Sequence, residues 1–326
     1  MDQVNKAKNS SLPPIGQLFK EAWNTFKRSL LQLILLNILG MAVYFLLAAL
    51  AFVILVLSGL GSSILQKGLM GLSAITPLSG IIFLAIGVIS LIIAAAAQIC
   101  AVLIVNDKAQ TKLVEKFKKS FSYIWPLFLI NLVTGFLTIG GSFLFVIPGI
   151  LFIMLFSYVQ FEVILNNQLG LSSIKRSVGI ISKNFGEIFI RYLLLILIYF
   201  GISIVLSIFK NILPQELKWL PNIISSIIHM FWGWFMLAFS IVLYKQSKSV
   251  TSNEEVSNII WIWIVAVLGW LIALSLTIIT WKVLYPEVLK DVETKLPQTV
   301  ILNSVKDFPL SSESSPSANK KTFGKN

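Results

Sequence analysis

The stretch LSGIIFLAIGVISLIIAAAAQICAVLIV, residues 78–105, contains no charged side chain. As a helix with a rise of about 1.5 Å per residue, it is long enough to cross a hydrocarbon core of about 30 Å. A continuous run of this kind, which does not alternate with polar residues, is typical of a membrane-spanning helix and not of a barrel strand. The sequence therefore predicts that this segment crosses a membrane.

Six further apolar runs resemble this one. Only 12% of the 326 residues are charged and the mean hydropathy is +0.86, whereas about a quarter of the residues of a soluble domain are charged. A tight hairpin is predicted at Val146–Gly149, because Pro148 suits the first turn of a helix and would interrupt a longer one. The predicted spans are Leu31–Leu57, Leu78–Val105, Ile124–Val146, Pro148–Leu165, Phe189–Ile208, Ile223–Tyr244 and Ile259–Trp281.

Three basic amphipathic segments each precede a pair of spans. In the first of them, Leu18, Ala22 and Phe26 share one helical face, and Lys20 lies on the other, as expected for a helix at a membrane interface. Any basic interfacial helix has this pattern, so convergence is the alternative to a true repeat. The three segments align over Phe19–Phe26, Phe117–Ile124 and Ile174–Ile181, and the apolar face of the first begins earlier, at Ile15.

These features predict an all-α, polytopic helical membrane protein, with a six-helix core, three cytoplasmic amphipathic helices and a seventh transmembrane helix. The predicted parts are a cytoplasmic N-terminal segment (1–29), the six-helix domain (30–245), a polar linker (246–258), the seventh span (259–283) and a polar, disordered tail (284–326).

Lys and Arg gather in the N-terminal segment and in alternate connections, which places the N-terminus in the cytoplasm of a multi-pass cell-membrane protein. We assign the net charge of +12 to this topology and to attraction for anionic lipid headgroups, not to nucleic acid. Membrane lipids are therefore the expected partners, together with a membrane protein or a second copy of the chain. The cations are Lys6, Lys8, Lys20, Lys27, Arg28, Lys108, Lys112, Lys116, Lys118, Lys119, Lys175, Arg176, Lys183, Arg191, Lys245 and Lys248.

The chain resembles a family of bacterial integral membrane proteins, namely the membrane domain attached to some glycerophosphoryl diester phosphodiesterases and related stand-alone proteins of unknown function. The likeness covers roughly residues 12–244. It implies a six-helix domain but not the hydrolase, whose catalytic barrel has no counterpart here. The residues that carry the likeness are Leu12–Gly16 with Trp23, Ile147–Ile150, Phe161–Leu165, Ser173–Ser177 and Phe185–Phe189.

The chain has one histidine, His229, and one cysteine, Cys100, which cannot build the clustered ligands of a zinc site. No Gly-rich loop ending in Gly-Lys-Ser or Gly-Lys-Thr is present, so a phosphate cradle of that type is unsupported. We therefore expect a non-enzymatic protein without catalytic residues, cofactor or metal.

Several polar residues share a narrow arc of the sixth predicted span, where polar groups usually face the interior of a bundle. The face is interpreted either as a hydrophilic path with His229 as a titrating group, or as interhelical packing with close approach at Gly233. Its members are Asn222, Ser225, His229, Gly233 and Ser240.

Near the cytoplasmic boundary, Glu162 and Arg191 can pair across the fourth connection. Asn37, Asn131 and Gln160 are isolated amides that we interpret as structural, and Gln98 lies beside a stripe of small residues. Two functions remain open. One is an accessory or lipid-associated membrane module, and the alternative is a small-solute or lipid transporter with a polar site near His229.

Overall fold

The computed structural model describes residues 12–57, 77–109, 111–212, 214, 217, 219–251 and 258–295. This part of the chain is helical and contains no strand. Seven helical segments in it are long and apolar enough to cross a membrane. The prediction of an all-α, polytopic helical protein is therefore confirmed.

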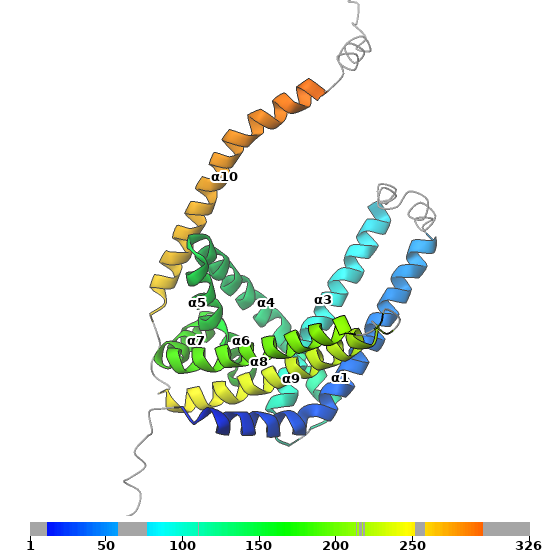
Figure 1. Ribbon diagram of the computed structural model, residues 1–326, viewed down its shortest axis with the longest axis vertical. Helices are drawn as coiled ribbons and strands as arrows, with labels where there is room; N and C mark the ends of the chain where they lie inside the picture. The colour runs from blue at the N-terminus through cyan, green and yellow to red at the C-terminus, as the bar shows by residue number, and fades with distance from the viewer. Residues whose placement is uncertain are drawn as a thin grey trace, which may run out of the picture. The chain divides into compact units, whose positions relative to one another are not determined.

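The first six spans form three hairpins (Figure 1). The connecting helix α7 (Leu171–Lys183) lies between the second and third hairpins, and α10 (Ile260–Lys295) follows the third. The hairpins are α1 (Ile15–Leu57) with α3 (Pro77–Asn106), α4 (Leu113–Leu144) with α5 (Val146–Phe156) and α6 (Val159–Asn166), and α8 (Phe185–Ile212) with α9 (Trp219–Val250).

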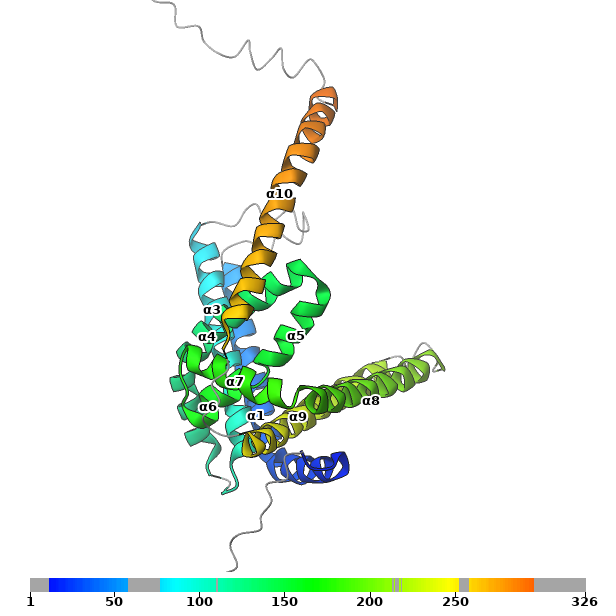
Figure 2. The same ribbon diagram turned by 90° about the vertical axis from the view of Figure 1, so that its left-hand side faces the viewer.

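Two of the three amphipathic segments are continuous with the span that follows, because α1 and α4 each contain both parts. We expected separate helices, but no glycine or proline divides the two parts of α1. Instead α1 bends (Figures 1 and 2), and the Ser29 hydroxyl donates to the Thr25 carbonyl at 2.9 Å, a bond that often bends helices. Only the third segment, α7, is a separate helix, which ends at Lys183.

The hairpin predicted at Val146–Gly149 is present. Helix α4 ends at Leu144, Phe145 is extended, and Pro148 lies in the first turn of α5. The fourth span is also broken at Ser157, between α5 and α6, which we did not predict. The hydroxyl of Ser177 on α7 donates to the carbonyl of Leu155 at 2.6 Å, so a neighbouring helix binds a carbonyl next to this break.

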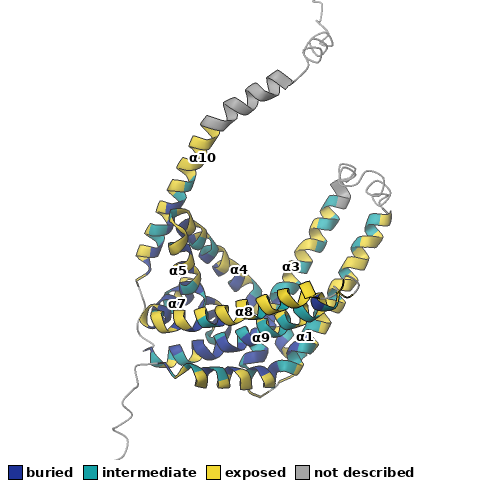
Figure 3. Ribbon diagram, viewed as in Figure 1, coloured by how far each residue is buried: buried dark blue, intermediate teal, exposed yellow. Residues whose placement is uncertain are grey.

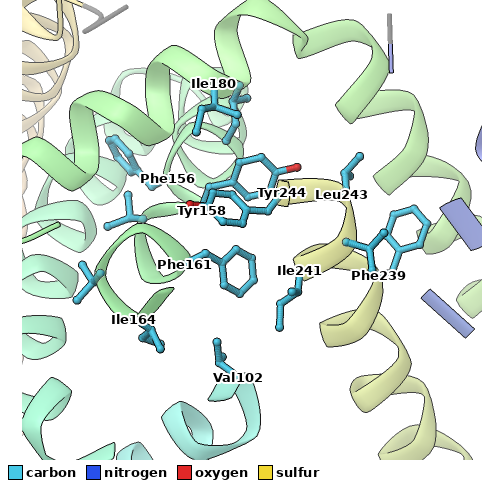
Figure 4. Close-up of a cluster of buried hydrophobic side chains, with 14 of the residues drawn as sticks. Val102, Phe156, Tyr158, Phe161, Ile164, Ile180, Phe239, Ile241, Leu243 and Tyr244 are labelled. Atoms are coloured by element: carbon cyan, nitrogen blue, oxygen red, sulfur yellow. The ribbon is translucent and has the colours of Figure 1, made fainter. Parts of the chain in front are cut away.

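The buried residues concentrate where the amphipathic segments meet the ends of α3, α6 and α9, whereas the far parts of the hairpins are exposed (Figure 3). We call this region the hub. Figure 4 shows its aromatic centre, in which the rings of Tyr158 and Tyr244 meet edge to face at 5.3 Å between centroids. In a membrane-spanning chain, exposed apolar residues on the hairpins are the ones that face lipid. Hub residues include Val102, Tyr158, Phe161, Ile180, Phe239, Leu243 and Tyr244.

The apolar face of the first amphipathic segment packs on α9. Leu18, Ala22 and Phe26 are buried as their spacing predicts, and Phe19 lies 5.3 Å from Phe239 between ring centroids. Lys20 on the opposite face is exposed. The apolar face of this segment therefore contacts α9. The segment also lies at the end of the spans where the cations gather.

The chain divides into two compact units, Met1–Trp270 and Leu271–Asn326. This division falls inside α10, not in the predicted linker 246–258, whose first residues belong to α9. Residues 284–295, which we predicted to be part of the disordered tail, are helical as the end of α10. The rest of the predicted tail, from 296 onward, lies outside the described residues, and so does the N-terminal segment up to residue 11.

Within the first unit, the start of α10 packs closely on α4. A Cβ atom added to Gly269 would overlap the carbonyl oxygen of Gly140, and one added to Gly140 would lie 2.6 Å from the carbonyl oxygen of Ala266. Trp270 stacks on Phe136 and donates its indole N–H to the Phe136 carbonyl at 3.1 Å. The two glycines therefore set the approach of these helices.

Candidate functional site

A fully buried carboxylate, Glu162 on α6, ties three helices together in the hub. Its Oε1 accepts the Tyr244 hydroxyl of α9 at 2.7 Å, and its Oε2 accepts the Asn166 amide at 3.2 Å. The Lys248 amine lies 3.5 Å from Oε1, and the Arg176 guanidinium of α7 lies 4.0 Å from Oε2. Two cations and two neutral donors thus compensate the burial of this charge.

The predicted pair of Glu162 with Arg191 is not the arrangement found, because each residue has other partners. Arg191 pairs with Glu187 at 3.0 Å and donates to the Pro13 carbonyl at 2.8 Å. The backbone N–H of Leu12 also donates to Glu187 at 3.3 Å. Arg191 therefore anchors the N-terminal segment to α8, while the packing of α6 against α7 and α9 gives Glu162 different cations.

Beside the break in the fourth span lies a group of buried hydroxyls. The Tyr158 hydroxyl lies next to the hydroxyls of Ser247 and Tyr192, but in a geometry that forms no hydrogen bond for Tyr158 or Ser247 within the described chain. Ser240, from the predicted polar face, lies beside Tyr192. The centre of the hub thus keeps hydrogen-bonding capacity that its own side chains do not use.

A groove of about 540 Å³ lies between α3, α4 and α6. Its lining is apolar except for three carboxamides, Gln98, Asn131 and Gln160, one from each helix. All three side chains are exposed, and none makes a hydrogen bond to any other residue that the structure describes. We call this the amide groove. The sequence showed Asn131 and Gln160 only as isolated amides and Gln98 only as a neighbour of a stripe of small residues, and the packing of three helices brings them together.

A second groove, of about 430 Å³, lies between the start of α1 and α9. Its lining is aromatic and aliphatic, with Trp23 and Trp232 among its members, and it includes no polar side chain. The Lys27 amine lies 6.0 Å from the centre of the Trp23 ring. The chemical difference between the grooves is therefore the presence of the three amides in the first.

The predicted polar face on α9 does not gather at one site. The Ser225 hydroxyl and His229 Nδ1 are 3.1 Å apart, and the Tyr199 ring lies 5.5 Å from His229 between centroids. Asn222, His229 and Gly233 are exposed, and a Cβ at Gly233 would meet no atom within 4 Å, so no close helix approach occurs there. These residues line neither of the two grooves described above.

Comparisons of the chain with known protein families, curated proteins and solved structures found no match. Among the described residues, no group of three or more His, Cys, Asp or Glu side chains is placed to hold a metal ion.

Proposed function

We propose that this chain is a non-enzymatic, multi-pass cell-membrane module that associates with anionic lipids at the cytoplasmic leaflet, with its N-terminus in the cytoplasm. The observation that supports this best is the position of the hub, which lies at the end of the spans where Lys and Arg gather. Lys118 and Lys119 on α4 and Lys20 on α1 are exposed there, and Lys175 on α7 is half-buried. Each cation near an anionic leaflet contributes about 1 kcal/mol of attraction.

The kinship with the phosphodiesterase membrane domain stays a prediction. The three hairpins around a common hub agree with this resemblance. The described part of the chain also agrees with it, because it consists of candidate membrane spans and not of a soluble barrel. Under that kinship, the module is an accessory part of the bacterial envelope.

The alternative, a transporter with a polar site near His229, draws support from the hydrogen bond between Ser225 and His229. A transport site requires a polar cavity that reaches this pair. The two grooves described above have other linings, so the lipid-associated module is the better supported proposal.

The lipid preference can be measured after reconstitution in nanodiscs that contain equal amounts of phosphatidylcholine and phosphatidylglycerol. We expect native mass spectrometry of wild type to show enrichment of bound phosphatidylglycerol. A variant that combines Lys118→Gln, Lys119→Gln and Lys175→Gln should lose this enrichment several-fold.

Lys210→Gln, at the opposite end of α8, is the matched control and should keep the wild-type enrichment. Equal enrichment in the triple variant and the control would argue against cytoplasmic anionic-lipid association.

A further inference from the structure

We propose that the amide groove binds a diacyl glycerolipid from the bilayer, whose ester carbonyl oxygens accept hydrogen bonds from Gln98, Asn131 and Gln160. This inference rests on the proposed function, and it names the lipid chemistry that one particular site recognises.

The three amides lie at a common depth. At about 1.5 Å per residue, Gln98 and Asn131 are both about 10 Å from the predicted cytoplasmic ends of their spans, and Gln160 is about 8 Å from its own. The span Leu78–Val105 is about 42 Å long as a helix, close to the thickness of a bilayer that includes its headgroup regions. A level about 10 Å inside its end is therefore about 4 Å inside the edge of a hydrocarbon core of about 30 Å, and glycerol esters, which lie at that edge, are within reach of a carboxamide side chain.

The chemistry of the groove fits an ester. A carboxamide is neutral and carries two N–H donors, which match an ester carbonyl oxygen, an acceptor without a net charge. In lipid an exposed amide has no water to bind, so an unpaired one is costly. Because the side chains of Gln98, Asn131 and Gln160 make no hydrogen bond within the described chain, the ester carbonyls of a lipid can supply their partners.

The remaining lining fits acyl chains. Val88, Leu91 and Ile92 on α3 and Phe128 on α4 are among the apolar residues that line the groove. The volume of about 540 Å³ is within the range of about 300–1,000 Å³ found for ligand pockets. The groove lies between helices that are each part of a membrane span, so bilayer lipid is the molecule that reaches it.

The direct test needs no mutation. Purified wild-type protein is exposed to ester-linked phosphatidylcholine or to the ether-linked phosphatidylcholine with the same chains, which lacks the carbonyl oxygens, and bound lipid is counted by native mass spectrometry. We expect tightly bound ester lipid and at least fivefold less ether lipid. Equal retention of the two lipids, or a copurifying ligand of another class that outcompetes the ester lipid, would overturn the inference.

Variants then locate the site. Gln98→Leu, Asn131→Leu and Gln160→Leu should each lower ester-lipid retention about fivefold, the factor of one lost neutral hydrogen bond. Asn37→Leu, an amide on α1 that does not line the groove, is the control and should have no effect. A triple Leu variant that is folded and still prefers ester over ether lipid would place the lipid elsewhere.

The two proposals fail independently. Phosphatidylcholine carries no net charge, so its ester preference does not depend on the lysines. If the ester preference is absent but phosphatidylglycerol is enriched, only the proposed groove ligand is wrong. If the ester preference is present but phosphatidylglycerol is not enriched, only the proposed anionic-lipid association is wrong.

Discussion

At the scale of single residues, Glu162 is the most informative side chain of the hub. A buried carboxylate is stabilising only when its charge and lone pairs are compensated, and here the compensation comes from α6, α7 and α9 together. Its role is to hold these helices in one arrangement. The amide groove includes Gln160, two residues earlier on the same helix, so its geometry depends on this contact.

Glu162→Gln should lower the thermal stability of the protein. The variant keeps the shape of the side chain but leaves the charges of Arg176 and Lys248 without their counter-ion. Both cations are partly exposed, so water offsets part of the loss, and we expect about 2 kcal/mol of destabilisation. Thermal unfolding in detergent measures it.

The matched control is Glu115→Gln, in the exposed first turn of α4. Equal melting temperatures for Glu162→Gln and this control would contradict the structural role of Glu162.

The sequence singled out Glu162 and Arg191 correctly as boundary charges, but not their partners. Which cation meets a carboxylate depends on how helices distant in the sequence pack, and Lys248 is far from Glu162 along the chain. The same holds for Gln98, Asn131 and Gln160, whose common depth was readable from the predicted spans but whose shared groove was not. Local sequence patterns indicate which residues are unusual, but they do not predict which residues those contact.

At the scale of helices, the contact of α10 with α4 depends on two glycines. Gly269→Ala should separate these helices, because the added Cβ overlaps the Gly140 backbone, which cannot rotate away. We expect a lower melting temperature and increased proteolysis of the segment around α10.

Gly233→Ala provides the control, since its Cβ meets no atom within 4 Å, and it should unfold like wild type. A Gly269→Ala variant as stable as Gly233→Ala would show that the close approach of α4 and α10 does not form.

The connector between α3 and α4 is held by Asp107. Its carboxylate pairs with Lys116 at 2.9 Å and accepts the backbone N–H groups of Ala109 and Thr111. Lys116 in turn donates to Gln32 of α1 at 2.7 Å. Burial alone would raise the pKa of Asp107, but the hydrogen bonds from Lys116, Thr111 and Ala109 hold this pKa well below its usual range.

Asp107→Asn should therefore destabilise the protein in a pH-dependent manner. A carboxylate whose pKa is lowered by folding stabilises the fold above its unfolded pKa of about 4, and this stability is lost as the pH falls toward the folded value. The difference in melting temperature between wild type and Asp107→Asn should be constant from pH 8 to about pH 5 and should shrink below about pH 4. A difference that grows on acidification would contradict this.

The helices themselves followed from sequence to a large extent. Hydropathy and the position of Pro148 predicted the spans and the hairpin between α4 and α5. The continuity of α1 through its amphipathic and apolar parts was missed, because a change in hydropathy is not a helix terminator. The break at Ser157 was missed because Ser157 and Tyr158 carry no strong local breaking signal, and Ser177 of another helix binds the Leu155 carbonyl beside it.

At the scale of the molecule, the three hairpins share one hub at the end of the spans where the cations gather, and the lipid proposals depend on which side of the membrane that end faces. If the hub is cytoplasmic, the basic connections and the amphipathic segments lie on the side of the membrane whose leaflet is anionic, as the distribution of Lys and Arg predicts. The orientation of the hub is therefore the central claim.

Labelling of single cysteines with an impermeant thiol reagent in intact cells tests this claim most directly. In a Cys100→Ala background, Lys118→Cys and Lys119→Cys mark the hub end of α4, and Lys210→Cys marks the far end of α8. We predict that Lys210→Cys is labelled in intact cells, whereas Lys118→Cys and Lys119→Cys are labelled only after the membrane is permeabilised. Labelling of Lys118→Cys and Lys119→Cys in intact cells, with protection of Lys210→Cys, would contradict the cytoplasmic hub.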